Sequence, residues 1–86
     1  MITGQQIKAA RELLGWAPSR LAQRAKLHSA IVRRAESVAG EPPITLYQQA
    51  LIRNALERFG VEFTNGNEPG VKLRKDPSPQ DRPLYE

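Results

Sequence analysis

Apolar residues at the start of the chain recur with the spacing of a helix. Within residues 3–15 they fall on one face and polar residues occupy the other. Thr3 is followed three residues later by Gln6, which is the pattern of a capping box, and Gly15 is typical of the residue just past a helix end. We therefore expect a first helix over residues 3–15. Its apolar face holds Ile7, Ala10 and Leu14, with Leu13 beside them.

Two shorter helical patterns follow. Pro18 has the fixed φ that suits the first position of a helix, which predicts a second helix over residues 18–25. A third helix is expected over residues 29–38, preceded by His28 at the N-cap position. The inward positions of the two helices are Leu21, Ala22, Ala25, Val32, Ala35 and Val38.

A break rich in proline and glycine at residues 40–43 separates these helices from a longer one. The apolar pattern predicts a fourth helix over residues 44–59, and Gly60 ends it. Its apolar stripe is expected to hold Tyr47, Leu51, Ile52, Ala55, Leu56 and Phe59.

After Gly60 the period changes from that of a helix to that of a strand. Residues 61–64 and 71–74 alternate between apolar and polar positions around a turn-rich segment, which predicts a β-hairpin. Its apolar face must be covered either by the helices or by another subunit, because an isolated hairpin is marginal in water. We expect this face to form a dimer contact through Val61, Phe63, Val71 and Leu73.

Composition narrows the class of protein. The 86 residues hold no cysteine and one histidine, which excludes disulfides and a thiolate zinc site, so no metal or other cofactor is expected. The sequence has no long apolar run, so neither a signal peptide nor a membrane span is expected. The sequence offers no glycine-rich phosphate loop and no paired nucleophile and base, so an enzyme is not expected, nor is a small-molecule ligand.

Charge is unevenly distributed. Residues 1–75 carry 12 basic and 6 acidic side chains, whereas residues 76–86 carry one basic and three acidic ones. The densest basic stretch, residues 20–34, contains no acidic residue. On charge alone, this stretch is equally compatible with a solvated face and with a nucleic-acid contact. Its basic residues are Arg20, Arg24, Lys26, Arg33 and Arg34.

Residues 21–36 contain the pattern that favours the nucleic-acid contact. Two short helices joined by a turn of about three residues fit a helix-turn-helix motif. The small residues among the inward positions allow the two helices to cross closely. The motif resembles the DNA-binding domain of the phage-repressor and Cro family, also called the XRE family, over roughly residues 3–59. The residues that carry the resemblance are Leu21, Ala22, Ala25, Leu27, Val32 and Glu36, with Arg11 in the first helix.

The resemblance implies a mainly α fold, with a four-helix lambda-repressor-like domain over residues 1–60. The alternating pattern adds a hairpin extension over residues 61–74, and three prolines among mostly polar neighbours predict a mobile tail over residues 75–86. The resemblance also implies an ion pair between Arg11 and Glu36 that ties the first helix to the third. Three positions depart from the common family pattern: Ala17 and Pro18 stand where Ser and Gln are usual, Lys26 where Gly is usual, and His28 where Ser or Thr is usual. A positive φ at Lys26 would cost roughly 1 kcal/mol.

By the same resemblance, the start of the third helix enters the major groove of DNA and the second helix lies across the backbone. The base-reading residues are expected to be Ser29, Ala30, Arg33, Arg34 and His28, with Ile31 in reach of a thymine methyl group. The phosphate-binding residues are expected to be Lys26, Arg20, Ser19 and Arg24. Alternatives remain at four of them: Ser29 contacting either a base or a phosphate, Arg33 contacting only phosphate, His28 serving as a cap, and Arg24 facing solvent. Arg53 and Arg58 are expected to lie on the fourth helix, away from the motif, with no DNA contact. Trp16 is expected to pack between the first two helices.

Two functions are compatible with these features. The first is a sequence-specific transcriptional regulator of the bacterial cytoplasm and nucleoid, acting as a homodimer on an inverted repeat of double-stranded DNA, with repression the simplest mechanism. The alternative is a protein-interaction module of the same fold, an antitoxin or anti-activator that binds a partner protein through the hairpin and tail. The sequence does not identify the operator.

Overall fold

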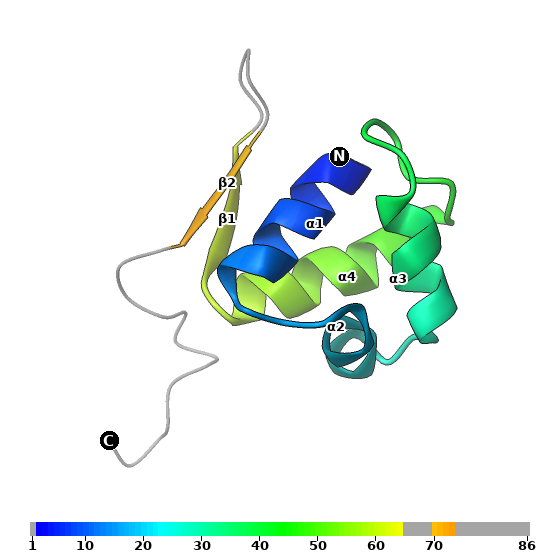
Figure 1. The fold of residues 1–86 in the computed structure, drawn as a ribbon, viewed down its shortest axis with the longest axis horizontal. Helices are drawn as coiled ribbons and strands as arrows, with labels where there is room; N and C mark the ends of the chain where they lie inside the picture. The colour runs from blue at the N-terminus through cyan, green and yellow to red at the C-terminus, as the bar shows by residue number, and fades with distance from the viewer. Residues whose placement is uncertain (1, 65–69, 74–86) are drawn as a thin grey trace.

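The computed structural model describes residues 2–64 and 70–73. Four helices come first along the chain and two antiparallel strands follow, forming a small, mainly helical domain with a hairpin at one side (Figure 1). The predicted tail, residues 75–86, lies outside the described residues. The elements are α1 (Gly4–Leu13), α2 (Pro18–Ala25), α3 (Ser29–Glu36), α4 (Leu46–Arg58), β1 (Val61–Thr64) and β2 (Gly70–Leu73).

Side chains just outside two of the helices determine where these helices begin. The Thr3 hydroxyl accepts a hydrogen bond from the Gln6 backbone at 3.1 Å, and the Gln6 side chain accepts one from the Thr3 backbone at 2.9 Å. This is the predicted capping box of α1. Thr45 and Gln48 form a second capping box at the start of α4, with both hydrogen bonds at 3.0 Å. Each box satisfies two backbone N–H groups that the helix leaves without a partner.

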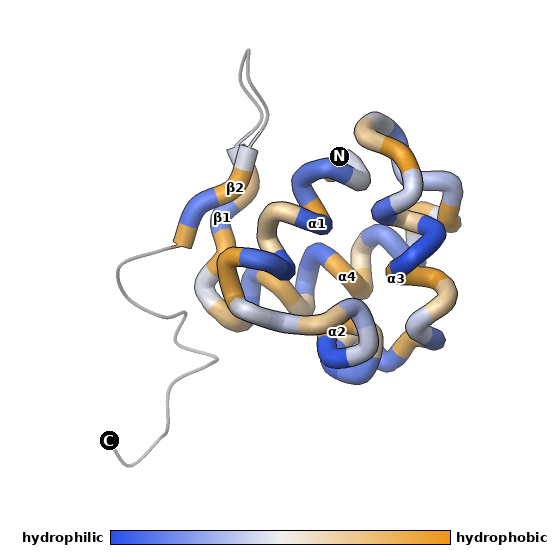
Figure 2. The backbone as a smooth tube through the Cα atoms, viewed as in Figure 1, coloured by the Kyte–Doolittle hydropathy of each residue, from blue (hydrophilic) through white to orange (hydrophobic). Residues whose placement is uncertain are grey.

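The core lies where the helices meet the first strand. Figure 2 shows hydrophobic and hydrophilic stretches alternating along each helix, as expected for helices with one apolar face. Leu21, Ala22 and Ala25 are buried as predicted, and so are Val32 and Ala35. The largest fully buried side chains are Ile7, Leu21, Val32, Pro42, Ile52, Leu56 and Val61.

Two residues assigned to the core are exposed instead. α3 ends at Glu36, short of the predicted residue 38, and Val38 is 38% exposed. The Ser37 hydroxyl donates to the Arg34 carbonyl at 2.6 Å, and the chain then leaves the helical direction. Tyr47 is 73% exposed because it lies on the side of α4 opposite the buried Ile52.

A glycine allows α1 to approach the end of α3 closely. The Gly4 backbone N–H donates to the Gly40 carbonyl at 2.8 Å. A Cβ at Gly4 would collide with the backbone oxygens of Ala35 and Val38. Any larger residue there would force α1 away from the third helix.

The hairpin packs against the helices of its own chain. Gln6 is buried, and its side-chain amide donates to the carbonyls of both Thr64 and Gly70 at 3.0 Å, which ties α1 to the end of the hairpin next to the connecting loop. The predicted hairpin is confirmed over the described residues, with the register Val61↔Leu73, Glu62↔Lys72, Phe63↔Val71 and Thr64↔Gly70. Among the described residues, no helix combines the length and apolar character needed to cross a membrane.

Candidate nucleic-acid interface

α2 buries one side and exposes polar groups on the other. Pro18 occupies its first position as predicted, and Ala17 at the N-cap provides no side-chain hydrogen bond. Pro18 has no N–H and the Arg20 N–H donates to the Ala17 carbonyl at 2.9 Å, so the Ser19 N–H is the group of the first turn that favours an anion. The exposed residues of the helix are Ser19, Arg20, Gln23 and Arg24.

The turn between α2 and α3 contains the only non-glycine residue with positive φ in the described part of the chain. Lys26 has φ 59° and ψ 43°, in the left-handed region, and its backbone N–H closes the end of α2. The Leu27 N–H donates to the Ala22 carbonyl at 2.9 Å, and the Leu27 side chain is partly buried against the core. The strain considered for Lys26 is therefore present, and its side chain is exposed.

α3 presents a basic face to solvent. His28 precedes it at the N-cap position and makes no side-chain capping hydrogen bond, although its backbone is extended as a cap requires. Val32 and Ala35 are fully buried. The side of α3 that faces away from them is exposed and holds Ala30, Arg33 and Arg34, whereas Ser29 and Ile31 lie partly buried at its margins.

An ion pair connects α3 to α1. The Arg11 Nε and Nη2 atoms donate to the two carboxylate oxygens of Glu36 at 2.8 and 3.0 Å, and Nη1 donates to the Trp16 carbonyl at 2.6 Å. The side chains are only 12% and 10% exposed. Hydrogen bonding to Glu36 raises the pKa of the Arg11 guanidinium above its ordinary value. The expected pair is present, and it fixes α3 relative to α1.

A shallow open groove brings the starts of α2 and α3 together. It places Ser29 in the same groove as Ser19 and Arg20, three residues that were assigned to base and phosphate contacts. Gln23 also lines this groove and was not among the expected site residues. Its position one turn after Ser19 on α2 is the sequence signal that would have identified it.

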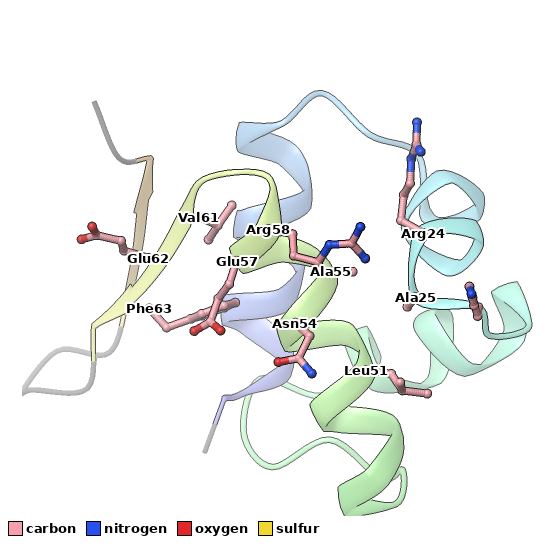
Figure 3. Close-up of a pocket in the computed structure, with 11 residues that line it drawn as sticks. Arg24, Ala25, Leu51, Asn54, Ala55, Glu57, Arg58, Val61, Glu62 and Phe63 are labelled. Atoms are coloured by element: carbon pink, nitrogen blue, oxygen red, sulfur yellow. The ribbon is translucent and has the colours of Figure 1, made fainter. Parts of the chain in front are cut away.

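The other two expected phosphate ligands lie elsewhere. Arg24 and Lys26 line a second groove, between α2, α4 and β1. Figure 3 shows this groove, with Arg24 on α2 and Arg58 on α4. The Arg24 guanidinium lies 5.3 Å from the centre of the Phe59 ring, a cation–π distance. Arg58, from α4, lines the same groove, so the expectation that it lies away from the motif is wrong. This second groove holds three basic side chains together with Glu57 and Glu62, whereas the first groove holds one basic side chain, Arg20.

Trp16 packs against the end of α4. Its ring lies edge-on to that of Phe59, with centroids 4.9 Å apart and an interplanar angle of 75°. This geometry is favourable for an aromatic pair. The tryptophan therefore joins the α1–α2 connection to α4, a wider role than the expected packing between the first two helices.

The residues expected to form a dimer contact on the hairpin lie mostly in the chain's own core. Val61 is 1% exposed, and Phe63 and Val71 pack against the buried cluster. Leu73, at 46% exposed, is the one member of the four left on the surface. The apolar face of the hairpin was expected to be covered either by the helices of its own chain or by another subunit. The helices of the same chain cover most of it.

Comparison of the chain with protein-family models, with characterised proteins and with solved structures found no match. The described residues include no cluster of three metal-ligating side chains.

Proposed function

We propose that this chain is a sequence-specific DNA-binding transcriptional regulator, in which α2, the turn at residues 26–28 and α3 act as a helix-turn-helix. The observation that carries the proposal is the exposed face of α3. It holds two arginines beside a small residue, Ala30, on a helix that is anchored by its opposite face and by the Arg11–Glu36 pair.

Each part of this surface has a role in the proposed complex. The start of α3 enters the major groove, where the small Ala30 lets the helix backbone approach the bases closely. Arg33 and Arg34 have the planar fork that matches the O6 and N7 atoms of guanine, a contact worth about 1–3 kcal/mol of discrimination. Ser19 and Ser29 meet in one groove and donate to phosphate oxygens, which sets the register of the helix on the duplex.

Backbone phosphates supply much of the affinity. Arg20 lines the same groove as the two serines. The second groove adds Lys26, Arg24 and Arg58, which outnumber the two carboxylates that line it, Glu57 and Glu62. Binding to any duplex should weaken steeply as salt rises, because each neutralised phosphate releases counterions. Two copies on an inverted repeat would occlude a promoter, and repression is the simplest regulatory outcome.

Fluorescence anisotropy with a labelled duplex tests the proposal. Selection from random duplexes first provides a preferred site. Arg34→Ala should reduce the preference for that site over a scrambled duplex, whereas Lys8→Ala removes one charge from α1 and should leave the preference unchanged. A wild-type protein that binds no duplex at low salt would rule the proposal out.

The alternative, a protein-interaction module acting through the hairpin and tail, has less support. The hairpin's apolar face rests largely on its own helices, and only Leu73 stays exposed on it. The tail lies outside the described residues.

A further inference from the structure

The exposed side chain of Arg24 is held against an aromatic ring. Its guanidinium carbon lies 5.3 Å from the centre of the Phe59 ring, and the Phe59 ring meets the Trp16 ring edge-on, with centroids 4.9 Å apart. Arg24 comes from α2, Phe59 follows the last residue of α4, and Trp16 lies in the connection between α1 and α2. Three separate segments of the chain therefore meet at one place, which we call the Trp16–Phe59–Arg24 stack.

We propose that Phe59 and Trp16 are positioning residues for DNA binding, which hold the Arg24 guanidinium where it meets a backbone phosphate. The inference rests on the proposed function, in which Arg24 is one of the phosphate ligands. It gives Phe59 a role beyond its place in the apolar stripe of α4. It also gives a defined direction to Arg24, which is otherwise a long side chain exposed to solvent.

The guanidinium keeps its charge and its hydrogen-bond donors in this stack. Within residues 2–64 and 70–73, Arg24 forms neither an ion pair nor a hydrogen bond. The two carboxylates of its groove have other partners, since Glu57 pairs with Arg53 at 3.0 Å and Glu62 pairs with Lys72 at 3.6 Å. An aromatic face attracts a cation without using its N–H groups, so these donors are available to a phosphate.

The stack also limits the freedom of a flexible side chain before DNA arrives. An arginine that moves freely in solvent loses much of its rotamer freedom when it binds a phosphate. Contact with Phe59 restricts Arg24 in the free protein, so less freedom is lost in the complex and the affinity is higher. This effect requires a ring that is itself well fixed.

The end of α4 fixes the Phe59 ring. Phe59 is the C-cap of this helix, and its backbone N–H donates to the Leu56 carbonyl at 3.1 Å. Gly60, with φ 96°, then turns the chain into β1. The edge-on contact with Trp16 restricts rotation of the ring.

Trp16 connects the stack to α3, the helix proposed to read the bases. Its carbonyl accepts a hydrogen bond from the Arg11 Nη1 atom at 2.6 Å, and its backbone N–H donates to the Arg11 carbonyl at 3.0 Å. Arg11 is also the residue that fixes α3 through Glu36. The phosphate contact of α2 and the base contacts of α3 are therefore held in one framework.

A double-mutant cycle in the DNA-binding assay tests this role. Phe59→Leu keeps an apolar side chain and removes the ring, so affinity for the selected duplex should fall about two- to fivefold, as for an exposed cation–π contact. The affinity should also depend less steeply on salt, by at most the roughly 0.9 unit of one phosphate contact. Phe59→Tyr keeps the ring and should bind as the wild type does. Phe59→Leu should have no further effect in an Arg24→Ala background, whereas its full effect should remain in an Arg20→Ala background.

Trp16→Leu provides a second variant that leaves the Phe59 ring in place and removes only its edge contact. It should weaken binding by a smaller factor than Phe59→Leu, again only when Arg24 is present. Urea unfolding shows that each variant is folded under the conditions of the assay. A Phe59→Leu loss that persists in Arg24→Ala, or that is equally large in Phe59→Tyr, would overturn the positioning role.

NMR spectroscopy of the 86-residue protein tests the stack without DNA. The side-chain resonances of Arg24 should be shifted by the ring current of Phe59, and this shift should disappear in Phe59→Leu. Unshifted Arg24 resonances in a wild-type protein that binds DNA would overturn this inference and leave the proposed function intact. Shifted resonances in a wild-type protein that binds no duplex would overturn the proposed function, and with it the role given to Phe59.

Discussion

Removing the carboxylate of Glu36 should strongly destabilise the domain. Glu36 accepts both hydrogen bonds of a bidentate pair with Arg11, and both side chains are almost fully enclosed. In Glu36→Ala the guanidinium keeps its bond to the Trp16 carbonyl but loses the group that neutralises it. A buried charge left without its partner is the costly outcome, rather than the loss of the attraction itself.

The size of the effect follows from the burial. Breaking a fully buried pair by removing one partner costs about 3–5 kcal/mol, and the residual exposure of 12% and 10% reduces this to about 2–4 kcal/mol. A domain of 86 residues has about 4–13 kcal/mol of stability in total. The variant should therefore lose a large share of it, with a fall in Tm of about 10–30 °C.

Urea unfolding monitored by circular dichroism measures the lost free energy of unfolding. A double-mutant cycle shows how much of that loss arises from the Arg11–Glu36 pair. Arg11→Met combined with Glu36→Leu removes both charges and should cost about 1–3 kcal/mol less than the sum of the single changes. The pKa of Arg11 is raised, so its contribution to stability is complete below the pKa of the unfolded chain and is lost only as pH rises through the folded value. The difference between wild type and Glu36→Ala that arises from Arg11 should thus be constant from about pH 6 to pH 9. A loss below 0.5 kcal/mol, or additive single changes, would refute the reasoning.

Three further changes probe the fold that supports the site. Lys26→Gly should raise the free energy of unfolding by about 0.5–1 kcal/mol, because the relief of the left-handed backbone strain exceeds the added entropy of the unfolded chain. The same change should weaken DNA binding, because it removes a positive charge. Gln6→Glu replaces the amide that donates to two strand carbonyls and should lower stability by about 2–4 kcal/mol. Gly4→Ala should cost about 3 kcal/mol, since its methyl group would collide with backbone oxygens at the end of α3. Urea titrations measure all three changes, and anisotropy measures the DNA affinity of the first.

Matched variants sharpen these tests. Lys26→Asn tolerates the same backbone region, so it should remove the charge with little loss of stability. Gly40→Ala has open space around its added methyl group and should be much milder than Gly4→Ala. A stabilised Lys26→Gly protein with unchanged DNA affinity would argue against a phosphate contact at Lys26, and a Gly4→Ala protein of wild-type stability would argue against the close approach of α1 to α3.

The order of the elements could be predicted from the sequence because each helix carries its own local signals. Thr3 and Gln6 mark one start, Pro18 another, and the glycines at positions 15 and 60 mark two ends. Boundaries set by tertiary contacts were harder to predict. The end of α3 depends on the hydrogen bonds of the loop at residues 39–40 to α1, which no local pattern contains.

Each misassigned residue has its own physical cause. Tyr47 belongs to an apolar series by composition, yet the helix turns it outward and buries Gln49 instead. The Thr45–Gln48 capping box places the start of α4 one residue after Thr45, so Tyr47 lies in the first turn of the helix. The hairpin residues were correctly placed on one face, but which surface covers that face depends on packing between distant segments.

The candidate site also contains residues that could be predicted from the sequence and residues whose position depends on packing. The Arg11–Glu36 pair and the exposed arginines of α3 follow from helical spacing and the family resemblance. The position of Arg58 beside Arg24 and Lys26 could not be predicted, because it depends on how α4 packs against α2.

Selection of bound sequences from random duplex DNA is the most direct test of the central claim that this chain reads DNA through α3. We expect enrichment of an inverted repeat whose half-sites lie about 34 Å apart, one turn of the duplex, with the preferred bases altered in Arg34→Ala. A selected pool with no sequence preference over the starting library would contradict the claim.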